Sequence, residues 1–239
     1  MSILEKINNN GPAKFAVLVD PDKASTPEIE SLVQGAESQN VDFFFVGGSY
    51  ISSGDIGHTI AQIKQKTHIP VVLFPGSVLQ IDPSADALLF LSLISGRNPD
   101  YLIGQHVIAA PYLHKLSMEV IPTGYMLIDS GKSTTASYMS NTIPLPINKP
   151  ELAASTALAG EMLGMKLIYA DAGSGAQNSI PPNIITAIKN KISIPLIIGG
   201  GIKDKETAKN CIDNGADLIV VGNAIEKNPH LINEISSIL

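Results

Sequence analysis

Two carboxylates and a lysine follow the first strongly apolar run of the sequence, in the stretch VDPDK. Asp20 and Asp22 carry the oxygen ligands that Mg²⁺ prefers, and Mg²⁺ in proteins commonly bridges the phosphates of a substrate. Ser49 follows two glycines after the next apolar run and could add a hydroxyl ligand beside them. The stretch is a candidate metal site, and the alternative is a capped turn at the start of a helix.

A second group of residues stands out because it lacks side chains. Three consecutive glycines, 199–201, follow the apolar run LII, and the pair Gly222-Asn223 follows the run LIVV. Glycine loses more conformational freedom on folding than any other residue, so three in a row indicate that something approaches the backbone closely. Exposed backbone N–H groups of such loops can bind a phosphate. The alternative is a tight turn with no ligand.

The elements that must position these residues recur along the whole chain as a short apolar run, a loop and a helical pattern. Most runs are continuously apolar, as expected of parallel strands buried on both faces. Eight such units in 239 residues predict an α/β fold, a (β/α)₈ TIM barrel that forms a single domain over residues 1–239, with a doubly wound open sheet as the alternative. The expected strands are 15–20, 42–48, 71–75, 87–92, 119–129, 166–171, 195–200 and 217–222.

The barrel prediction brings the two groups of residues to one rim, because active sites of such barrels lie where the strands end. Barrel enzymes often bind a phosphate after strands 7 and 8, where the glycines 199–201 and the pair Gly222-Asn223 stand. The segment NAIEKNP is expected to form a short extra helix there, with Asn223 as its cap. Pro122 and Gly124 predict a bulge in the fifth strand.

The stretch DSGKST (129–134) resembles the end of a nucleotide-binding Walker A loop. It lacks the first glycine of that motif, since Met126 stands in its place. We therefore expect a polar loop, from which Lys132 could contact an anionic substrate.

Composition restricts the classes of function. With 44% hydrophobic and 16% charged residues the chain is globular, and its net charge of −6 argues against a general nucleic-acid surface. The single cysteine, Cys211, excludes an internal disulfide framework and is expected in the core. No run approaches the roughly 20 apolar residues of a membrane span, and the first residues do not form a signal peptide. We expect a cytoplasmic chain with no transmembrane segment.

Six stretches taken together resemble a known family. The stretches VDPDK, FFFVGGS, VLFPGS, YADAGSGA, IIGGGI and GADLIVVGNAI occur in the order typical of geranylgeranylglyceryl phosphate synthases and their bacterial PcrB relatives. The resemblance extends from about residue 14 to residue 228. The stretch RNPDYLIGQH (97–106) is similar to that family's helix after strand 4, and GYMLIDSGKSTTASYMSNTIPLP is similar to its longer second group.

The resemblance implies a Mg²⁺-dependent prenyltransferase of phospholipid biosynthesis, a phosphoglycerol geranylgeranyltransferase. It would join sn-glycerol 1-phosphate to a polyprenyl diphosphate, with geranylgeranyl diphosphate as the first candidate, and release diphosphate. By motif position, Asp20 and Ser49 would bind Mg²⁺. We also expect a homo-oligomer and a transient membrane contact for the lipid product. The implied residues for glycerol 1-phosphate are Tyr169, Ala170, Asp171, Ala172, Gly173, Ser174, Gly175, Gly200, Gly201, Gly222 and Asn223.

Asp171 is the expected catalytic base, because a glycerol hydroxyl must lose its proton to attack the allylic carbon. The family usually carries glutamate at this position, and aspartate is one methylene shorter, so the residue could instead orient the substrate. Tyr101 is expected in the floor of an apolar groove for the polyprenyl tail, with ordinary helix packing as the alternative.

Two other classes of function compete with this interpretation. Another phosphate-binding TIM-barrel enzyme, such as a sugar-phosphate isomerase or lyase, would share the glycines after strands 7 and 8. It would not explain Asp20 together with Ser49 or the order of the motifs. A barrel that binds phosphate without catalysis would not need the carboxylates Asp20 and Asp171.

Overall fold

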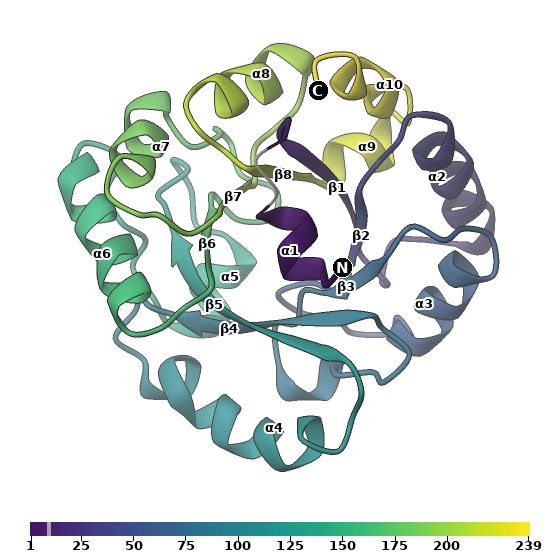
Figure 1. The fold of residues 1–239 in the computed structure, drawn as a ribbon, viewed down its shortest axis with the longest axis horizontal. Helices are drawn as coiled ribbons and strands as arrows, with labels where there is room; N and C mark the ends of the chain where they lie inside the picture. Colours follow the sequence, from purple (N-terminus) through teal and green to yellow (C-terminus); the bar gives the residue numbers. More distant parts are fainter. Residues whose placement is uncertain (9–10) are drawn as a thin grey trace.

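Eight parallel strands pair in sequence order, and the last returns to pair with the first, so that the sheet closes into a barrel (Figure 1). The computed structural model describes residues 1–8 and 11–239. The TIM-barrel prediction is confirmed. The strands are β1 Lys14–Val19, β2 Phe43–Val46, β3 Val71–Leu73, β4 Ala87–Leu93, β5 Glu119–Leu127, β6 Leu167–Asp171, β7 Leu196–Gly199 and β8 Leu218–Val221.

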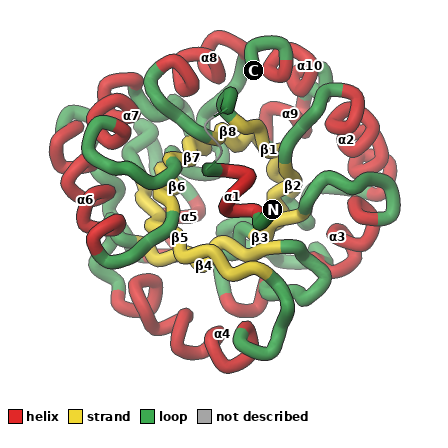
Figure 2. Tube along the Cα trace, viewed as in Figure 1, coloured by secondary structure: helices red, strands yellow, loops and turns green. Residues whose placement is uncertain are grey.

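Helices form a layer around the barrel, seen as the red tubes outside the yellow strands in Figure 2. Several start at a side-chain cap: Asp55 accepts the backbone N–H of His58 at 2.9 Å, and Asp204 accepts that of Thr207 at 2.8 Å. The outer helices are α2 Thr26–Ser38, α3 Ile56–Lys64, α4 Gln105–Leu113 after the wider turn η2 Asp100–Gly104, α6 Pro150–Met162, α7 Pro182–Lys189, α8 Lys205–Asp213 and α10 Leu231–Ser236. Shorter segments between strands and helices are η1 Val78–Gln80, α5 Thr135–Ser140 and α9 Asn223–Lys227.

Alternate residues of each strand enter two different cores, which explains the continuously apolar runs. In β2, Phe43 and Phe45 point into the barrel and Phe44 and Val46 pack against the helices, and all four are buried. Cys211 of α8 lies in the outer core, 1% exposed, as expected. Each strand therefore holds the barrel interior and the helix layer together.

The predicted bulge in β5 is wrong. The strand pairs without interruption with β4, from Ala87↔Glu119 to Leu93↔Tyr125. The carbonyl of Pro122 accepts the N–H of Lys166, which lies one residue before β6 begins. The N–H that Pro122 lacks would point to the same side, beyond the start of β6, so proline is tolerated at this position. Gly124 is required by packing, because a Cβ there would lie 2.8 Å from the Cδ1 of Ile168.

A short N-terminal helix that the sequence analysis missed, α1 Ile3–Ile7, closes the end of the barrel where the strands begin (Figure 1). Ile3 and Ile7 are buried and belong to the core of the barrel interior. The carboxylate of Glu119, at the start of β5, accepts the N–H of Ile3 at 2.6 Å and that of Leu4 at 3.1 Å. One carboxylate thus fixes the free N–H groups of the helix that plugs the barrel.

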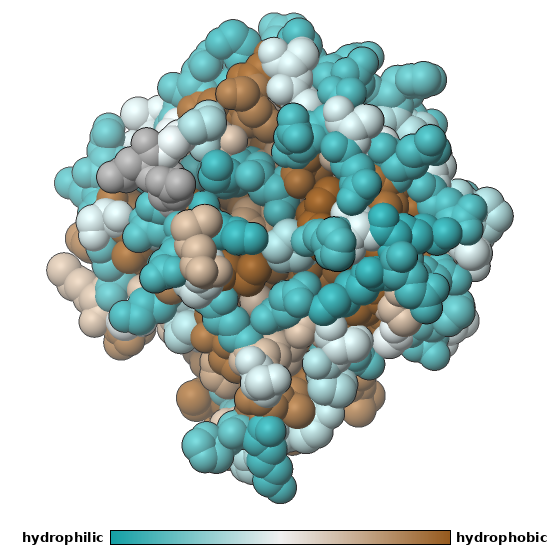
Figure 3. Space-filling model, turned by 45° about the vertical axis from the view of Figure 1, so that its right-hand side comes forward, coloured by the Kyte–Doolittle hydropathy of each residue, from teal (hydrophilic) through white to brown (hydrophobic). Residues whose placement is uncertain are grey.

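The surface carries exposed hydrophobic side chains on the α4 side of the barrel. Ile103, Val107 and Ile108 are each at least 60% exposed. In the view of Figure 3, hydrophilic side chains cover most of the surface, and hydrophobic patches lie between them, several in the lower half at the height of α4. None of the helices in the described part of the chain combines the length and the apolar character needed to cross a bilayer.

Replacing Glu119 with alanine tests the plug. Glu119→Ala removes the acceptor of two helical N–H groups, so α1 should fray and expose its isoleucines. We expect the free energy of unfolding to fall by about 1–3 kcal/mol in urea denaturation. Glu151→Ala, at an exposed position in the first turn of α6, serves as the control and should change stability much less. Equal stability of Glu119→Ala and the parent chain would contradict the role of Glu119 in holding α1 at the end of the barrel.

Candidate active site

A cavity of about 820 Å³ opens at the rim where the strands end, and most of the predicted site residues line it. The cavity walls come from the loops after β1, β2, β6, β7 and β8, so the barrel brings together residues more than 200 positions apart in the chain. The predicted residues in its lining are Asp20, Ser49, Tyr169, Asp171, Gly173, Ser174, Gly175, Gly200, Gly201, Gly222 and Asn223.

Two predicted ligands do not reach this cavity. Ala170 and Ala172 are at most 2% exposed and belong to the outer core against the helices. The reason is the alternation of β6, which turns Tyr169 and Asp171 inward and the alanines outward. The N–H of Ala172 is also taken by the carbonyl of Gly199, at 3.0 Å.

The consecutive glycines are required first by the protein itself. Gly200 and Gly201 adopt φ values of +76° and +71°, a region that side chains disfavour. A Cβ at Gly200 would lie 2.6 Å from the Oδ1 of Asp171, and one at Gly201 would lie 2.6 Å from the N of Ser179. The neighbouring loop after β6 is therefore what approaches the backbone of Gly200 and Gly201.

Gly175 differs from these two positions. Its φ is +70°, yet a Cβ there would have the Nδ2 of Asn223, at 3.9 Å, as its nearest neighbour. Space beside Gly175 therefore belongs to the cavity and not to packed protein. Ser174 and Gly175 are exposed, so an anion in the cavity could approach the backbone here.

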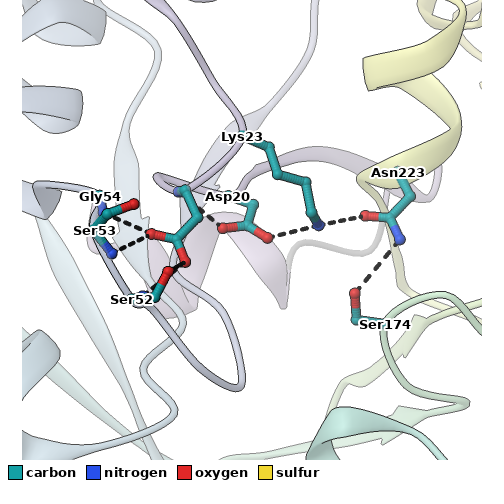
Figure 4. A network of polar contacts seen from close by, with 8 residues as sticks. Asp20, Lys23, Ser52, Ser53, Gly54, Ser174 and Asn223 are labelled. Carbon is teal, nitrogen blue, oxygen red and sulfur yellow. Dashed lines mark hydrogen bonds and ion pairs between the residues drawn. The ribbon is translucent and has the colours of Figure 1, made fainter.

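A chain of polar contacts crosses the cavity rim and joins the loops after β1, β6 and β8 (Figure 4). The Nζ of Lys23 lies 2.7 Å from the Oδ2 of Asp20 and donates to the Oδ1 of Asn223 at 3.3 Å. The Nδ2 of Asn223 donates in turn to the Oγ of Ser174 at 3.4 Å. The expectation that Asn223 caps the short helix is wrong: Gly222 occupies the cap position of α9, and the Asn223 side chain spans the rim.

Asp22 has a different role from Asp20. Its Oδ1 accepts the N–H groups of Ser53 and Gly54 at 2.9 and 2.6 Å, and its Oδ2 accepts the N–H of Ser52 at 2.7 Å. These backbone donors lower the pKa of Asp22 well below its ordinary value. Both oxygens of Asp22 hold the loop after β2, the loop that carries Ser49. Asp20 accepts a single backbone N–H, that of Asp22 at 3.1 Å on Oδ1, and its Oδ2 pairs with the mobile ammonium of Lys23, so Asp20 is the better placed of the two for a ligand.

Asp171 lies at the end of β6, 6% exposed, with a hydrogen bond to each oxygen. The hydroxyl of Tyr125 donates to Oδ2 at 2.6 Å, and the N–H of Gly173 donates to Oδ1 at 2.7 Å. Burial raises the pKa of Asp171, and the two hydrogen bonds oppose that rise. A carboxylate with a raised pKa accepts a proton more readily than an exposed one.

Tyr125, the hydrogen-bond donor to Asp171, is a residue of the candidate site that the sequence analysis missed. It stands opposite Tyr169 in the β5–β6 register, and Phe74 stacks on Tyr169 with ring centroids 4.8 Å apart. Burial and the charge of Asp171 raise the pKa of both tyrosine hydroxyls, so both stay protonated, and that of Tyr125 donates to Asp171. The register of the two strands would have revealed the pair, but register is not readable from an isolated apolar run.

An apolar groove adjoins the cavity on the side of β3 and β4. Because β3 ends at Leu73, opposite Leu88, the rest of β4 has no strand neighbour on that side and leaves an opening toward α4. The groove shares Gly48, Ser49 and Phe74 with the cavity. Its other walls include Val78, Leu89, Phe90, Leu91, Leu93, Tyr101, His106, Ala109, Tyr125 and Met139.

A family model described as the PcrB family matches residues 8–239. The chain belongs to the PcrB family. It is similar to two curated members, each named geranylgeranylglyceryl phosphate synthase. The one from Spirosoma linguale is 50% identical over 100% of this chain and 96% of its own length. The one from Chitinophaga pinensis is 51% identical over 95% of this chain and 90% of its own length.

A solved structure of the same family has the same fold. It is (S)-3-O-geranylgeranylglyceryl phosphate synthase from Thermoplasma acidophilum, in complex with its substrate sn-glycerol-1-phosphate. That chain is 34% identical to this one with a TM-score of 0.91, and the match covers 100% of this chain and 97% of that one. The resemblance to the family is confirmed.

In this PcrB-family chain the donors that could hold a metal are few. Among residues 1–8 and 11–239, no group of three or more histidine, cysteine, aspartate or glutamate side chains is close enough to bind one. Asp20 and Ser49 offer a carboxylate and a hydroxyl, and a Cβ at Gly48, next to Ser49, would lie 3.7 Å from the Oδ1 of Asp20. Mg²⁺ usually keeps several waters and binds through one or two carboxylates plus substrate phosphates, so this donor set fits it.

Gly201 and Gly175 form a matched pair for testing which glycines the packing requires. Their φ values are alike, so replacement by alanine should cost the same backbone strain at both. Only at Gly201 would the Cβ collide with the backbone of Asn178 and Ser179. We expect Gly201→Ala to lower the free energy of unfolding by about 1–3 kcal/mol more than Gly175→Ala in urea denaturation. Equal losses would mean that close packing is not what selects glycine at 201.

Tyr125→Phe tests the hydrogen bond that holds Asp171. Phenylalanine keeps the ring and removes the donor that stabilises the ionised carboxylate, so the pKa of Asp171 should rise further. Infrared difference spectra of the protonated carboxyl group across a pH titration would show the midpoint moving to higher pH. Tyr169→Phe is the control. Among the described residues, the hydrogen bonds to Asp171 come from Tyr125 and Gly173, and the Tyr169 hydroxyl makes none. A midpoint unchanged in Tyr125→Phe would remove Tyr125 from this role.

Proposed function

We propose that this chain is a prenyltransferase that forms an ether between sn-glycerol 1-phosphate and a polyprenyl diphosphate, with geranylgeranyl diphosphate as the first candidate. The observation that carries the proposal is the junction of two sites of opposite character. A polar cavity with glycine loops and the carboxylates of Asp20 and Asp171 meets an apolar groove at Gly48, Ser49 and Phe74. An amphipathic substrate whose diphosphate lies beside Asp20 and Ser49 would extend its tail along the groove.

Glycerol phosphate would occupy the opposite side of the cavity. Its phosphate would bind at the accessible backbone beside Gly175, with Ser174 and Asn223 as side-chain donors. Asp171 lies in the same cavity, where its carboxylate can contact a glycerol hydroxyl. Holding the hydroxyl and the allylic carbon in one site converts a bimolecular step into an effectively unimolecular one.

In the reaction, the glycerol oxygen forms a bond to the allylic carbon, and the bond from that carbon to diphosphate breaks. Asp171 accepts the hydroxyl proton, and its burial makes it a stronger base than an exposed aspartate. Tyr125 and Gly173 fix the orientation of the carboxylate. Asp20 and Ser49 would hold Mg²⁺, which supplies positive charge against the negative charge that develops on the leaving diphosphate. Lys132, in the cavity lining, could add a second cation.

The exposed hydrophobic side chains support two further parts of the proposal. A homo-oligomer and a transient membrane contact each require an apolar surface outside the site. Ile103, Val107 and Ile108 provide one on the α4 side, and α4 carries the groove-lining residues His106 and Ala109 on its other face.

The direct test is an assay for the ether product. The full chain is incubated with labelled sn-glycerol 1-phosphate, Mg²⁺ and prenyl diphosphates of several lengths, with and without EDTA. We expect a labelled product that extracts into chloroform, forms with geranylgeranyl diphosphate and disappears with EDTA. A folded chain that yields no product at any chain length would contradict the proposed function.

Asp171→Asn separates a base from a binding residue. Asparagine keeps the shape and the hydrogen-bonding capacity and loses proton acceptance. A positioned base typically contributes about 10²–10⁴-fold, so the single-turnover rate should fall by that factor while the calorimetric affinity for glycerol phosphate changes far less. A loss confined to affinity would leave Asp171 as a residue that orients the substrate.

A further inference from the structure

Lys23 lies between the two halves of the site. Its Nζ is 2.7 Å from the Oδ2 of Asp20, on the metal side, and 3.3 Å from the Oδ1 of Asn223, on the phosphate side (Figure 4). Asn223 is itself bonded to Ser174, which borders the accessible backbone of Gly175. The ammonium therefore touches residues of both halves.

The other lysines of the cavity lining are placed differently. Lys203 donates to the carbonyl of Gln177 at 2.8 Å, and within residues 1–8 and 11–239 the ammonium groups of Lys132 and Lys227 make no hydrogen bond or ion pair. A turn also fixes the backbone of Lys23, because its N–H donates to the carbonyl of Asp20 at 3.0 Å. A four-carbon stem on a fixed turn lets the ammonium move by a few ångströms without a backbone change.

We propose that Lys23 is a further ligand of the phosphate group of glycerol phosphate, and that Asp20 holds it away from that ligand until the carboxylate is engaged by a cation. This inference rests on the proposed function. An ammonium group has three donors, of which one faces Asp20 and one Asn223. Once the Asp20 carboxylate is shared with another cation, its attraction for Lys23 weakens, and an anion beside Asn223 becomes the better partner.

The arrangement makes the two halves of the site interdependent. A cation bound at Asp20 releases Lys23 toward the phosphate. By thermodynamic reciprocity, a bound phosphate that attracts Lys23 leaves the Asp20 carboxylate freer for a cation. Asp20 thus has a second function as the counter-ion that restrains Lys23. Replacing Asp20 with a neutral residue should strengthen glycerol phosphate binding in the absence of any metal.

A double-mutant cycle by calorimetry tests this without the reaction. sn-Glycerol 1-phosphate is titrated in EDTA into the parent chain, Asp20→Asn, Lys23→Met and the double variant. We expect Asp20→Asn to bind more tightly than the parent chain. Lys23→Met should weaken binding about twofold in the parent background and about tenfold or more in the Asp20→Asn background, where the ammonium is free to make a charge-assisted hydrogen bond. Lys23→Arg in the Asp20→Asn background should keep most of the affinity.

Lys227→Met provides the matched control, since it removes an exposed lysine from the same cavity lining and should weaken binding equally in both backgrounds. Equal costs of Lys23→Met in the two backgrounds would overturn the proposal, because a fixed charge acts independently of Asp20. Absence of glycerol phosphate binding in the folded parent chain would instead contradict the proposed function itself.

Discussion

The pairing of β1 with β8 is the contact on which the site depends. It aligns Lys14 with Leu218 and Val17 with Val221, and it closes eight strands into a ring. Without closure the ends of the first and last strands would lie on opposite edges of a sheet. With closure, Lys23 and Asn223 come within 3.3 Å of one another although 200 residues separate them. The polar chain across the rim is a consequence of that one register.

Three aspartates at this rim show how environment divides one residue type into three functions. Asp22 is surrounded by backbone N–H groups, which lower its pKa and make it a fixed anchor of a loop. Asp171 is buried beside tyrosines, and burial raises its pKa toward the range useful for proton transfer. Asp20 is 17% exposed at its side chain and shares an oxygen with an ammonium group, so it can exchange that partner for another cation.

The glycines at the strand ends differ in what their missing side chains make possible. Gly200 and Gly201 let the loop after β6 lie against the end of β7, and this contact sets the position of Asp171 and Gly173. At Gly175, in contrast, an added Cβ would have its nearest neighbour at 3.9 Å, so its side-chain space is open to the cavity. Close packing therefore explains Gly200 and Gly201, and the proposed phosphate site is the open space beside Gly175.

The sequence by itself determined the fold class, the order of the strands and the rim on which the site lies, because buried parallel strands are apolar throughout and their ends carry the glycines and carboxylates. It placed Asp20, Ser49, Asp171 and Asn223 at one cavity. Tertiary structure alone decided which side chains meet there. Strand alternation turned Ala170 and Ala172 away, register brought Tyr125 to Asp171, and loop contacts bound Asp22 to the loop after β2. Such choices depend on contacts between residues distant in sequence, and a local pattern of residue types carries no information about them.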